Sequence, residues 1–344
     1  MILAGALALA FGPTAMAQPR PIDAAAASER GALMGQAFTR WAEENGVEQG
    51  AIAVLFRGQP SGGAGFGGRG IDDAAPVASL SKAVTGLCAA RLIDAGRLDY
   101  DTTVGEALAE FITRSGATGD PRLAGVTVGQ LLSHRSGLPR AQPLVNRRAD
   151  WAPGMRSPLE AQAHRVLSAP LESAPGARYE YSNQGYILLS YLIETVAGED
   201  YEAHCRRAVF DPVGATTARL NPRFPETPRS GAGGWTVSAA DYARFADQLR
   251  PDRAGHGPRT RAWLAERETD VPFYGLGYQY RGPPGGPRIL THSGLLTDPE
   301  LSVSAQFVLW PSGLTVALNV TPARPRVLDD LIAELGRIAS GRAP

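Results

Sequence analysis

The stretch PVASLSKAVTG, residues 76–86, holds Ser79 and, three positions later, Lys82, which is the only lysine of the chain. Residues three apart on a helix lie one turn apart on the same face, so the Lys82 amine can reach the Ser79 hydroxyl. A serine becomes a strong nucleophile when a neighbouring base takes its proton. Lysine can be that base when burial or a nearby charge lowers its pKa, whereas arginine stays protonated. The stretch therefore predicts a nucleophile with its base, although a motif this short also arises by chance.

The overall composition is that of a globular protein without a nucleic-acid partner. The chain has 344 residues, a net charge of zero and no run rich in lysine or arginine. This length allows one large domain or two lobes around a sizeable core. Without a basic patch there is no electrostatic footprint for nucleic acid. After the N-terminal segment, no stretch is long and apolar enough to predict a membrane span.

The N-terminal segment is typical of a secretory signal. An apolar run extends from Ile2 to Phe11, and residues 15–17 form an A-x-A site. This pattern predicts a signal peptide over residues 1–17, cleaved after Ala17, although no positive charge precedes the apolar run. We therefore expect a secreted or periplasmic protein whose mature domain spans residues 18–344. No cysteine follows the apolar run, so a lipid anchor has no acceptor there.

Two cysteines, Cys88 and Cys205, lie in segments with helical patterns. An oxidising compartment permits a disulfide between them, but buried free cysteines are common in protein cores. We expect two unpaired core thiols. Neither cysteine lies in the histidine and cysteine spacing of a metal site or a catalytic thiol, so the sequence predicts no metal.

Strand patterns occur at both ends of the chain, and helical patterns fill its middle. Strands are expected at residues 51–58, 288–294, 302–311 and 314–321, and helices at 31–46, 79–96, 126–139, 183–198, 236–249 and 327–339. Residues 18–30 are expected to be a loose leader and 140–175 a long surface loop. The pattern predicts an α+β fold, in which one antiparallel sheet is built from both chain ends and flanked by terminal helices, with a large, mostly helical insertion. The sheet lobe is expected at about 31–78 plus 265–344, and the helical lobe at about 79–264.

Two other patterns resemble a dinucleotide-binding loop and a catalytic triad. The run GAGFGG, residues 63–68, matches the G-x-G-x-x-G of dinucleotide-binding loops. No helix opens after it, so a glycine-rich hairpin beside the strand at 51–58 explains it better. His134, between Ser133 and Ser136, has the neighbours of a triad base. A histidine in the turn that ends a helix can simply satisfy backbone groups, and we expect a structural His134.

Two more segments follow the Ser79 motif in order: YSN at 181–183 and HSG at 292–294. With S-x-x-K before them, the chain resembles the serine β-lactamase and penicillin-binding-protein superfamily. It is most similar to the class C-like branch, which includes esterases and D-amino-acid peptidases. That family carries S-x-x-K, Y-x-N and K-T-G or H-x-G in this order. Further similar segments are GRLDYDTTV (96–104), VTVGQLLSHRSGLP (126–139), VFDPVGATTARL (209–220) and GGWTVSAADYARF (233–245).

The resemblance implies roles for the first two motifs. Ser79 is expected to be the acyl-forming nucleophile, and Lys82 its activating partner. Tyr181 is expected to move the proton between the nucleophile and the leaving group. Asn183 is expected to hold a substrate amide or to steady Lys82. Which of Lys82 and Tyr181 is the base stays open, and without the resemblance Tyr181 and Asn183 would be taken as caps of the apolar helix from 183.

The third motif is expected to form the opposite wall of the cleft. The resemblance implies that His292, Ser293 and Gly294 contact the substrate there. The backbone N–H groups of Ser79 and Leu295 are expected to form the oxyanion hole. No metal and no organic cofactor is implied.

The sequence departs from β-lactamases where specificity is set. Those enzymes usually carry lysine on the wall strand as a fixed cation for the substrate carboxylate, and here His292 stands in its place, largely neutral near pH 7 if unperturbed. An arginine from the loop at 140–156 can still replace that charge. After Gly294, a position where the family is rich in glycine, Leu295-Leu296-Thr297 make the rim more apolar. These departures favour a small-molecule ester or amide as the substrate.

Three functions follow from these residues. The favoured one is an exported serine hydrolase, esterase-like, that forms an acyl-enzyme on Ser79. The second is a D,D-peptidase, D-aminopeptidase or β-lactamase that acts on cell-wall peptides or β-lactams, because one fold hosts several activities. The third is a non-catalytic binding protein on the same scaffold. The oligomeric state is left open.

Overall fold

The computed structural model describes residues 22–341 except for 118, 141–147, 222–229, 252, 254, 268–272, 284–285 and 299–300. The signal peptide predicted for residues 1–17 lies outside the described residues. Residues 141–147, near the start of the loop expected at 140–175, also lie outside them. Within the described part, no helix has the length and the apolar character needed to cross a membrane.

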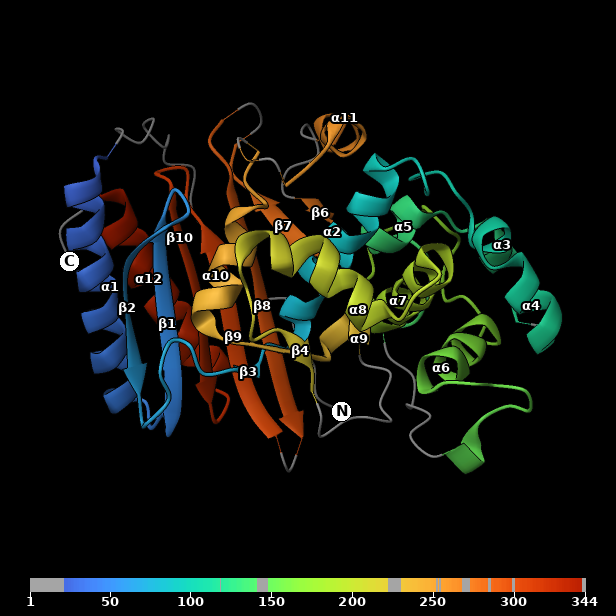
Figure 1. Ribbon diagram of the computed structural model, residues 1–344, viewed down its shortest axis with the longest axis horizontal. Coiled ribbons are helices and arrows are strands. Elements are labelled where there is room, and N and C mark those ends of the chain that lie inside the picture. Colours follow the sequence, from blue (N-terminus) through green and yellow to red (C-terminus); the bar gives the residue numbers. More distant parts are fainter. Residues whose placement is uncertain are drawn as a thin grey trace.

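A seven-stranded antiparallel sheet joins the two ends of the chain (Figure 1). Its strand order is β2-β1-β10-β9-β8-β7-β6. β1 and β10 pair from Gln49 opposite Thr321 to Phe56 opposite Leu314, so segments from the two chain ends meet in the middle of the sheet. This confirms the predicted α+β fold and the sheet built from both ends. The strands are β1 (Gln49–Phe56), β2 (Gln59–Phe66), β6 (Phe273–Gly275), β7 (Tyr278–Arg281), β8 (Ile289–Asp298), β9 (Leu301–Leu309) and β10 (Leu314–Thr321).

β8 is longer than the sequence indicated. Its pairing with β9 continues from Leu290 opposite Leu309 to Asp298 opposite Leu301, so the residues after Gly294 belong to the strand. β7 pairs with β8 only at Ile289–Thr291. The edge of β8 that faces β7 therefore has no strand neighbour beyond Thr291 among the described residues.

Two helices cover one face of the sheet, which we call the back face. They are α1 (Ala24–Glu44) and α12 (Pro325–Ser340). The loose leader expected up to residue 30 was wrong, because α1 begins at Ala24 and the Asp23 side chain caps it by accepting from the Ala26 N–H at 2.8 Å. A Cβ on Gly31 would lie 2.1 Å from the Ser61 carbonyl oxygen, so the glycine lets α1 approach the backbone of β2 closely.

The remaining helices lie on the other face, the front face, and beyond the edge of the sheet, to the right in Figure 1. α7 is their centre, since its residues from Gln184 to Ile193 are all buried. These helices are α2 (Ser81–Asp94), α3 (Val104–Ala107), α4 (Ala109–Ser115), α5 (Val128–Leu132), α6 (Pro158–Leu167), α7 (Asn183–Ala197), α8 (Tyr201–Cys205), α9 (Ser230–Gly233), α10 (Ala239–Asp247) and α11 (Pro258–Ala265). Shorter turns at Ala78–Leu80, Pro121–Gly125, Arg148–Asp150, Arg206–Phe210 and Asp211–Val213 connect them, and a small sheet of order β3-β5-β4 joins β3 (Ala75–Pro76), β5 (Trp235–Val237) and β4 (Arg219–Leu220).

One predicted loop and one predicted helix differ from the structure. The stretch expected as a surface loop over 140–175 contains α6, which Ser157 caps and whose apolar face is buried. The helix expected at 126–139 is shorter, because α5 ends at Leu132 and His134 takes a left-handed backbone with φ of 56°. α10 begins at Ala239, and the Ser238 side chain caps it by accepting from the Asp241 N–H at 3.1 Å.

The two cysteines form a disulfide, so the expected pair of free thiols was wrong. Cys88 on α2 and Cys205 at the end of α8 have Cα atoms 5.5 Å apart, although 117 residues separate them in the chain. That distance is within the usual range for a disulfide. Helical periodicity places each cysteine in the core, but it carries no information on which helices pack together.

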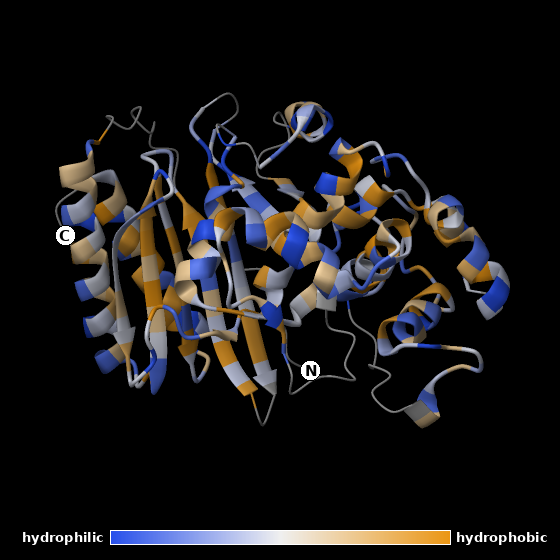
Figure 2. Ribbon diagram, viewed as in Figure 1, coloured by the Kyte–Doolittle hydropathy of each residue, from blue (hydrophilic) through white to orange (hydrophobic). Residues whose placement is uncertain are grey.

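Apolar side chains form one cluster on each face of the sheet. Figure 2 shows hydrophobic residues, in orange, along the central strands of the sheet. The back core includes Phe38 and Trp41 of α1, Leu331 of α12 and Val316 of β10. The front core is larger and joins alternate residues of the same strands to the helices from α2 to α11. This alternation follows from the period of two in a strand, which sends neighbouring side chains to opposite faces.

Candidate active site

Ser79 lies in a single helical turn, Ala78–Leu80, that connects β3 to α2. Ala78 just before it has φ of 49°, a left-handed conformation that is uncommon for a residue with a side chain. Such conformations persist where the surrounding structure holds them, and they often occur at functional sites. Lys82 follows on the first turn of α2 and is fully buried.

The Lys82 amine has three polar neighbours. Its Nζ lies 2.8 Å from Asn183 Oδ1, 2.7 Å from the Ala232 carbonyl oxygen and 3.3 Å from Ser79 Oγ. Burial, and then the positive charge of Arg140, hold the pKa of Lys82 well below its usual value of 10.5. When neutral, the amine can donate to Asn183 and to Ala232 and keep its lone pair for the proton of Ser79.

Tyr181 and Asn183 come from the segment that opens α7. Tyr181 forms a side-chain hydrogen bond with Ser79, and burial raises its pKa well above 10, so it rests as a neutral phenol. Asn183 is the first residue of α7, but Ser182 caps this helix, with Oγ accepting from the Gly185 N–H at 3.2 Å. The capping role considered for Tyr181 and Asn183 was therefore wrong, because both side chains turn to Ser79 and Lys82 instead.

His134 holds the backbone on both sides of Tyr181. Its carbonyl oxygen accepts from the Glu180 N–H at 2.7 Å, and its Nδ1 accepts from the Ser182 N–H at 3.1 Å. Its ring centroid lies 4.4 Å from that of Tyr181. Burial, with the nearby charge of Lys82 next in size, lowers the pKa of His134 well below 6.5 and keeps the imidazole neutral, so Nδ1 remains an acceptor.

His292 lies on β8 with both ring nitrogens engaged. Its Nε2 is 2.9 Å from the Tyr274 hydroxyl, and its Nδ1 is 2.7 Å from the Ser293 carbonyl oxygen. A carbonyl only accepts, so Nδ1 carries the proton and Nε2 accepts from Tyr274. Burial, followed by the charge of Lys82, lowers the pKa of His292 to about 3. This wall of the site therefore has a neutral imidazole at the position where β-lactamases usually carry a lysine.

Gly294 lets β8 pack directly against the Ser79 turn. A Cβ on Gly294 would lie 2.5 Å from the Val77 carbonyl oxygen and 3.1 Å from Ala78 Cβ, so no larger residue fits without a shift. Ser293 before it and Leu295 after it are exposed. β8 thus passes close to the turn that holds the nucleophile, where the Leu295 N–H would have to contribute to an oxyanion hole. That role of the Ser79 and Leu295 N–H groups stays a prediction.

The predicted residues meet in one place, and sequence reasoning missed several of their neighbours. Missed were the Ala232 carbonyl, the phenol of Tyr274 and two further rings around His134, those of Tyr179 and Tyr186. The YGLGY run at 274–278 offered no chemical signal of its own. Among the described residues, no group of three histidine, cysteine or acidic side chains is placed to hold a metal ion.

Comparison with known proteins gives the family of this chain. The β-lactamase family model matches residues 34–336. None of the curated proteins matches the chain. Similar solved structures include SurE with D-Leu, with 22% sequence identity and a TM-score of 0.70 over 91% of this chain and 76% of that chain.

Two further structures cover almost all of their own chains. A class C β-lactamase from Rhodobacter sphaeroides has 17% identity and a TM-score of 0.66, covering 88% of this chain and 99% of that one. The D-amino acid amidase from Ochrobactrum anthropi SV3, complexed with D-phenylalanine, has 16% identity and a TM-score of 0.68, covering 89% and 99%. At these identities the likeness shows the fold. Through the family match over residues 34–336 and its ordered motifs, the chain belongs to the β-lactamase family of the serine β-lactamase and penicillin-binding-protein superfamily.

Proposed function

We propose that this protein is an exported serine hydrolase that cleaves esters or amides through an acyl-enzyme on Ser79. The surroundings of the Lys82 amine carry the proposal. A buried lysine with a lowered pKa, two acceptors for its N–H groups and a serine hydroxyl at 3.3 Å has the arrangement of a base beside its nucleophile. A binding protein has no need of an unprotonated lysine at that position.

The reaction starts when neutral Lys82 takes the proton of Ser79. The Ser79 oxygen then forms a bond to the substrate carbonyl carbon, and the carbonyl oxygen becomes an oxyanion near the N–H groups of Ser79 and Leu295. As the bond to the leaving group breaks, the Tyr181 phenol donates its proton to the leaving oxygen or nitrogen. The Lys82 ammonium returns a proton to Tyr181 through a water molecule.

Water then releases the product from the acyl-enzyme. Lys82, neutral again, takes a proton from the attacking water, and the bond between the acyl carbon and Ser79 Oγ breaks. Ser79 Oγ recovers the proton, so the enzyme returns to its starting state. Lys82 is preferred over Tyr181 as the base because burial lowers the pKa of the amine and raises that of the phenol.

The residues of β8 favour an ester or amide substrate that needs no carboxylate next to β8. His292 is neutral near pH 7, and both of its nitrogens already have partners. Leu295 is one of the few large apolar side chains exposed in the described residues, at 46%, and Tyr179 near His134 is another, at 47%. Exposed apolar side chains beside a nucleophile suit an acyl chain.

Export is supported by two features. The N-terminal segment has an apolar run and an A-x-A site. The disulfide between Cys88 and Cys205 is a bond that persists in oxidising compartments such as the periplasm.

The test is the hydrolysis of p-nitrophenyl butyrate and nitrocefin, side by side, by the wild type and by Ser79→Ala. Ester turnover that disappears in Ser79→Ala, with little turnover of nitrocefin, is the expected result. Ser133→Ala is the matched control, because the Ser133 hydroxyl donates to the Gly129 carbonyl at 2.7 Å and sits beside His134 rather than Lys82. Turnover that survives in Ser79→Ala but is lost in Ser133→Ala would refute the site.

A second function, on amides of D-amino acids or on β-lactams, is favoured by what similar structures contain. One is a D-amino acid amidase with D-phenylalanine, another is SurE with D-Leu, and a third is a class C β-lactamase. Covalent labelling of Ser79 by a penicillin, or strong turnover of nitrocefin, would favour this function over the first. Failure of a fluorophosphonate to label Ser79 would leave the non-catalytic binding protein.

A further inference from the structure

Arg140 is held beside the reacting serine. Its carbonyl oxygen accepts from the Asn183 N–H at 2.8 Å, which fixes its backbone at the start of α7. Its guanidinium carbon lies 5.4 Å from the ring centroid of Tyr181, the residue whose hydroxyl forms the hydrogen bond with Ser79. The side chain is exposed, so its charge faces the solvent at the mouth of the site.

The positive charge of Arg140 acts on the ionisable groups of the site. The charge of Arg140 lowers the pKa of both Lys82 and His134, and no carboxylate raises either pKa. Elsewhere in the described residues, buried acids meet arginines, as Asp247 meets Arg250 at 2.9 Å and Glu160 meets Arg114. A guanidinium charge that no neighbouring acid offsets attracts an anion from solution.

The opposite wall cannot serve an anion in the same way. His292 is neutral, and the exposed side chains near it, Ser293 and Leu295, carry no charge. Arg281 on β7 also acts on this wall, where its charge lowers the pKa of His292, but it is partly buried and donates to Gln279 Oε1 at 2.9 Å. Arg140 is the exposed cation beside Tyr181. A guanidinium presents paired N–H donors that match the two oxygens of a carboxylate.

We propose that Arg140 sets the specificity of this site by binding an anionic group, such as a carboxylate, on the ester or amide substrate. The inference rests on the proposed hydrolysis at Ser79 and narrows its substrates. It places charge recognition on the segment that follows α5 and not on β8.

The test compares substrates that differ only in charge. On the acyl side, mono-p-nitrophenyl adipate replaces the terminal methyl group of p-nitrophenyl hexanoate by a carboxylate. On the leaving-group side, 3-carboxy-4-nitrophenyl butyrate adds a carboxylate to p-nitrophenyl butyrate. For each pair the ratio of kcat/KM, charged over neutral, is measured in the wild type, Arg140→Gln, Arg140→Lys and the control Arg135→Gln. Arg135 is exposed on the same segment and contacts the Gly176 carbonyl instead of Tyr181.

The wild type should prefer the charged member of at least one pair, and that pair tells which half of the substrate carries the charge. In Arg140→Gln this ratio should fall about 10- to 100-fold, the usual loss of a hydrogen bond to a charged group, with Arg140→Lys between the two and Arg135→Gln unchanged. No preference in the wild type, or a preference that survives in Arg140→Gln, would overturn the proposal.

Anion binding is also measured without turnover, which separates this inference from the proposed function. Adipate at increasing concentration should raise the Tm of the wild type and of Ser79→Ala, but not that of Arg140→Gln, because a ligand stabilises the folded state it binds. If neither ester pair is hydrolysed while adipate still shifts the Tm through Arg140, hydrolysis of these esters fails and the anion site stands. If esters are hydrolysed without charge preference and adipate has no effect, the hydrolase stands and the anion site fails.

Discussion

On the back face of the sheet, α1 and α12 enclose a core of Phe38, Trp41, Val316, Leu331 and their apolar neighbours. On the front face, the helices enclose a larger core that also contains ionisable side chains. The buried acidic, basic and histidine residues of the described chain are Lys82, His134, Glu160, His204, Asp241, Asp247, Arg250, His256 and His292. All of them belong to the helical segments or to strand residues that pack on those segments, and none lies under α1 or α12.

The difference indicates where the molecule gains stability and where it gives some up. Burial of apolar surface stabilises a protein by roughly 25 cal/mol per Å². The back core is built from apolar side chains, so its contribution is to stability. Burying a charged group costs free energy unless partners compensate for lost water. Lys82 and His292 are held by such partners, so the front core contains groups that only a chemical function explains. Substitutions on the two faces should therefore separate activity from stability.

The largest effect is expected at Lys82. Replacement by Met or Arg should lower kcat/KM for p-nitrophenyl butyrate about 10³-fold or more, because neither residue accepts a proton from Ser79. Lys82→Met should melt no lower than the wild type, since an apolar residue in a buried site avoids the desolvation of an amine. Activity that persists in Lys82→Arg would contradict the role of Lys82 as base.

The pH dependence of the wild type sharpens this prediction. Only the neutral amine is a base, so kcat/KM should rise with pH as Lys82 loses its proton, at a pH below its usual pKa of 10.5. His292 has a pKa of about 3 and stays neutral, so it adds no step near pH 6 to 7. Removing the charge in Arg140→Gln should raise the pKa of Lys82 and move the profile to higher pH. A profile that is flat from pH 5 to 10 would argue against a titrating base.

The second effect is expected on the back face, where a substitution should lower stability and leave activity unchanged. Phe38 is fully buried between α1 and the sheet, and Phe38→Ala should lower the free energy of unfolding by about 3–5 kcal/mol. Denaturant unfolding measures the loss, and kcat/KM per folded molecule should stay near that of the wild type. A large fall in kcat/KM at low denaturant, in protein that is still folded, would mean that the two faces are coupled.

The third effect is expected at His134, which touches Tyr181 without touching Ser79 in any contact described above. His134→Leu loses the acceptor for the Ser182 N–H, so kcat should fall about 10- to 100-fold with a smaller change in KM. His134→Asn should recover most of the kcat, because its side-chain oxygen can accept the same N–H and asparagine tolerates the left-handed backbone. Equal loss in both variants would refute the positioning role.

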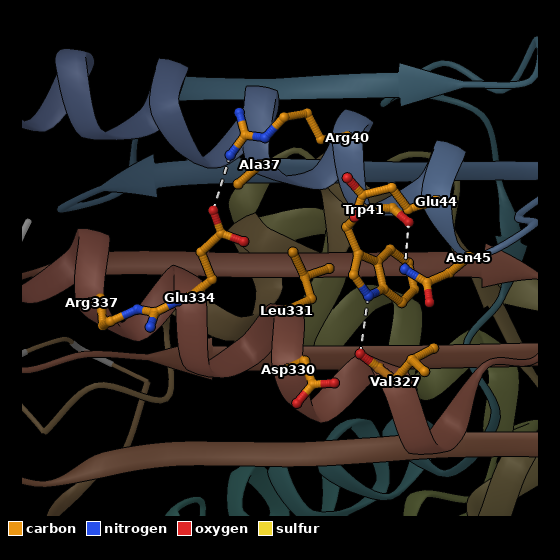
Figure 3. Close-up of a pocket in the computed structure, with 10 residues that line it drawn as sticks. All are labelled: Ala37, Arg40, Trp41, Glu44, Asn45, Val327, Asp330, Leu331, Glu334 and Arg337. Atoms are coloured by element: carbon orange, nitrogen blue, oxygen red, sulfur yellow. Dashed lines mark hydrogen bonds and ion pairs between the residues drawn. The ribbon is translucent and has the colours of Figure 1, made fainter. Parts of the chain in front are cut away.

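The smallest effect is expected at the ion pair that spans α1 and α12. Arg40 and Glu334 are 3.0 Å apart on the rim of a cavity of about 400 Å³ between these helices (Figure 3). The Arg40 side chain is 59% exposed, and exposed pairs contribute roughly 0–1 kcal/mol. Arg40→Gln should therefore change the unfolding midpoint little and kcat/KM not at all. A loss above about 2 kcal/mol would show that this cavity matters more than its exposure suggests.

Much of the architecture was predictable because its signals are local. Alternating and continuous apolar runs predicted β1, β8, β9 and β10, and glycine-closed helical patterns predicted α2 and α7. β6 and β7 were missed, since strands of three and four residues carry too little periodicity. α6 was missed because prolines and arginines around it resemble a loop, although Ser157 and Pro158 are a helix start.

The candidate site was predictable only in part. The ordered motifs placed Ser79, Lys82, Tyr181 and Asn183 in one cleft, and the structure brings these residues together. The Ala232 carbonyl lies 150 positions from Lys82 and is a backbone group, so no residue type announces it. The contact of Arg140 with Tyr181 depends on how the segment after α5 packs against the start of α7, which spacing along the chain does not reveal.

The sequence by itself determined which residues can carry chemistry: one lysine one helical turn from a serine, and the motifs that follow in order. Such features are fixed by residue type and by spacings within a single element. Only the tertiary structure decided that Cys88 pairs with Cys205, that His134 holds Tyr181 in place and that His292 is neutral while Arg140 faces the solvent. These depend on which helices and strands pack together and on how much water each group keeps, and both are properties of contacts between residues far apart in the chain.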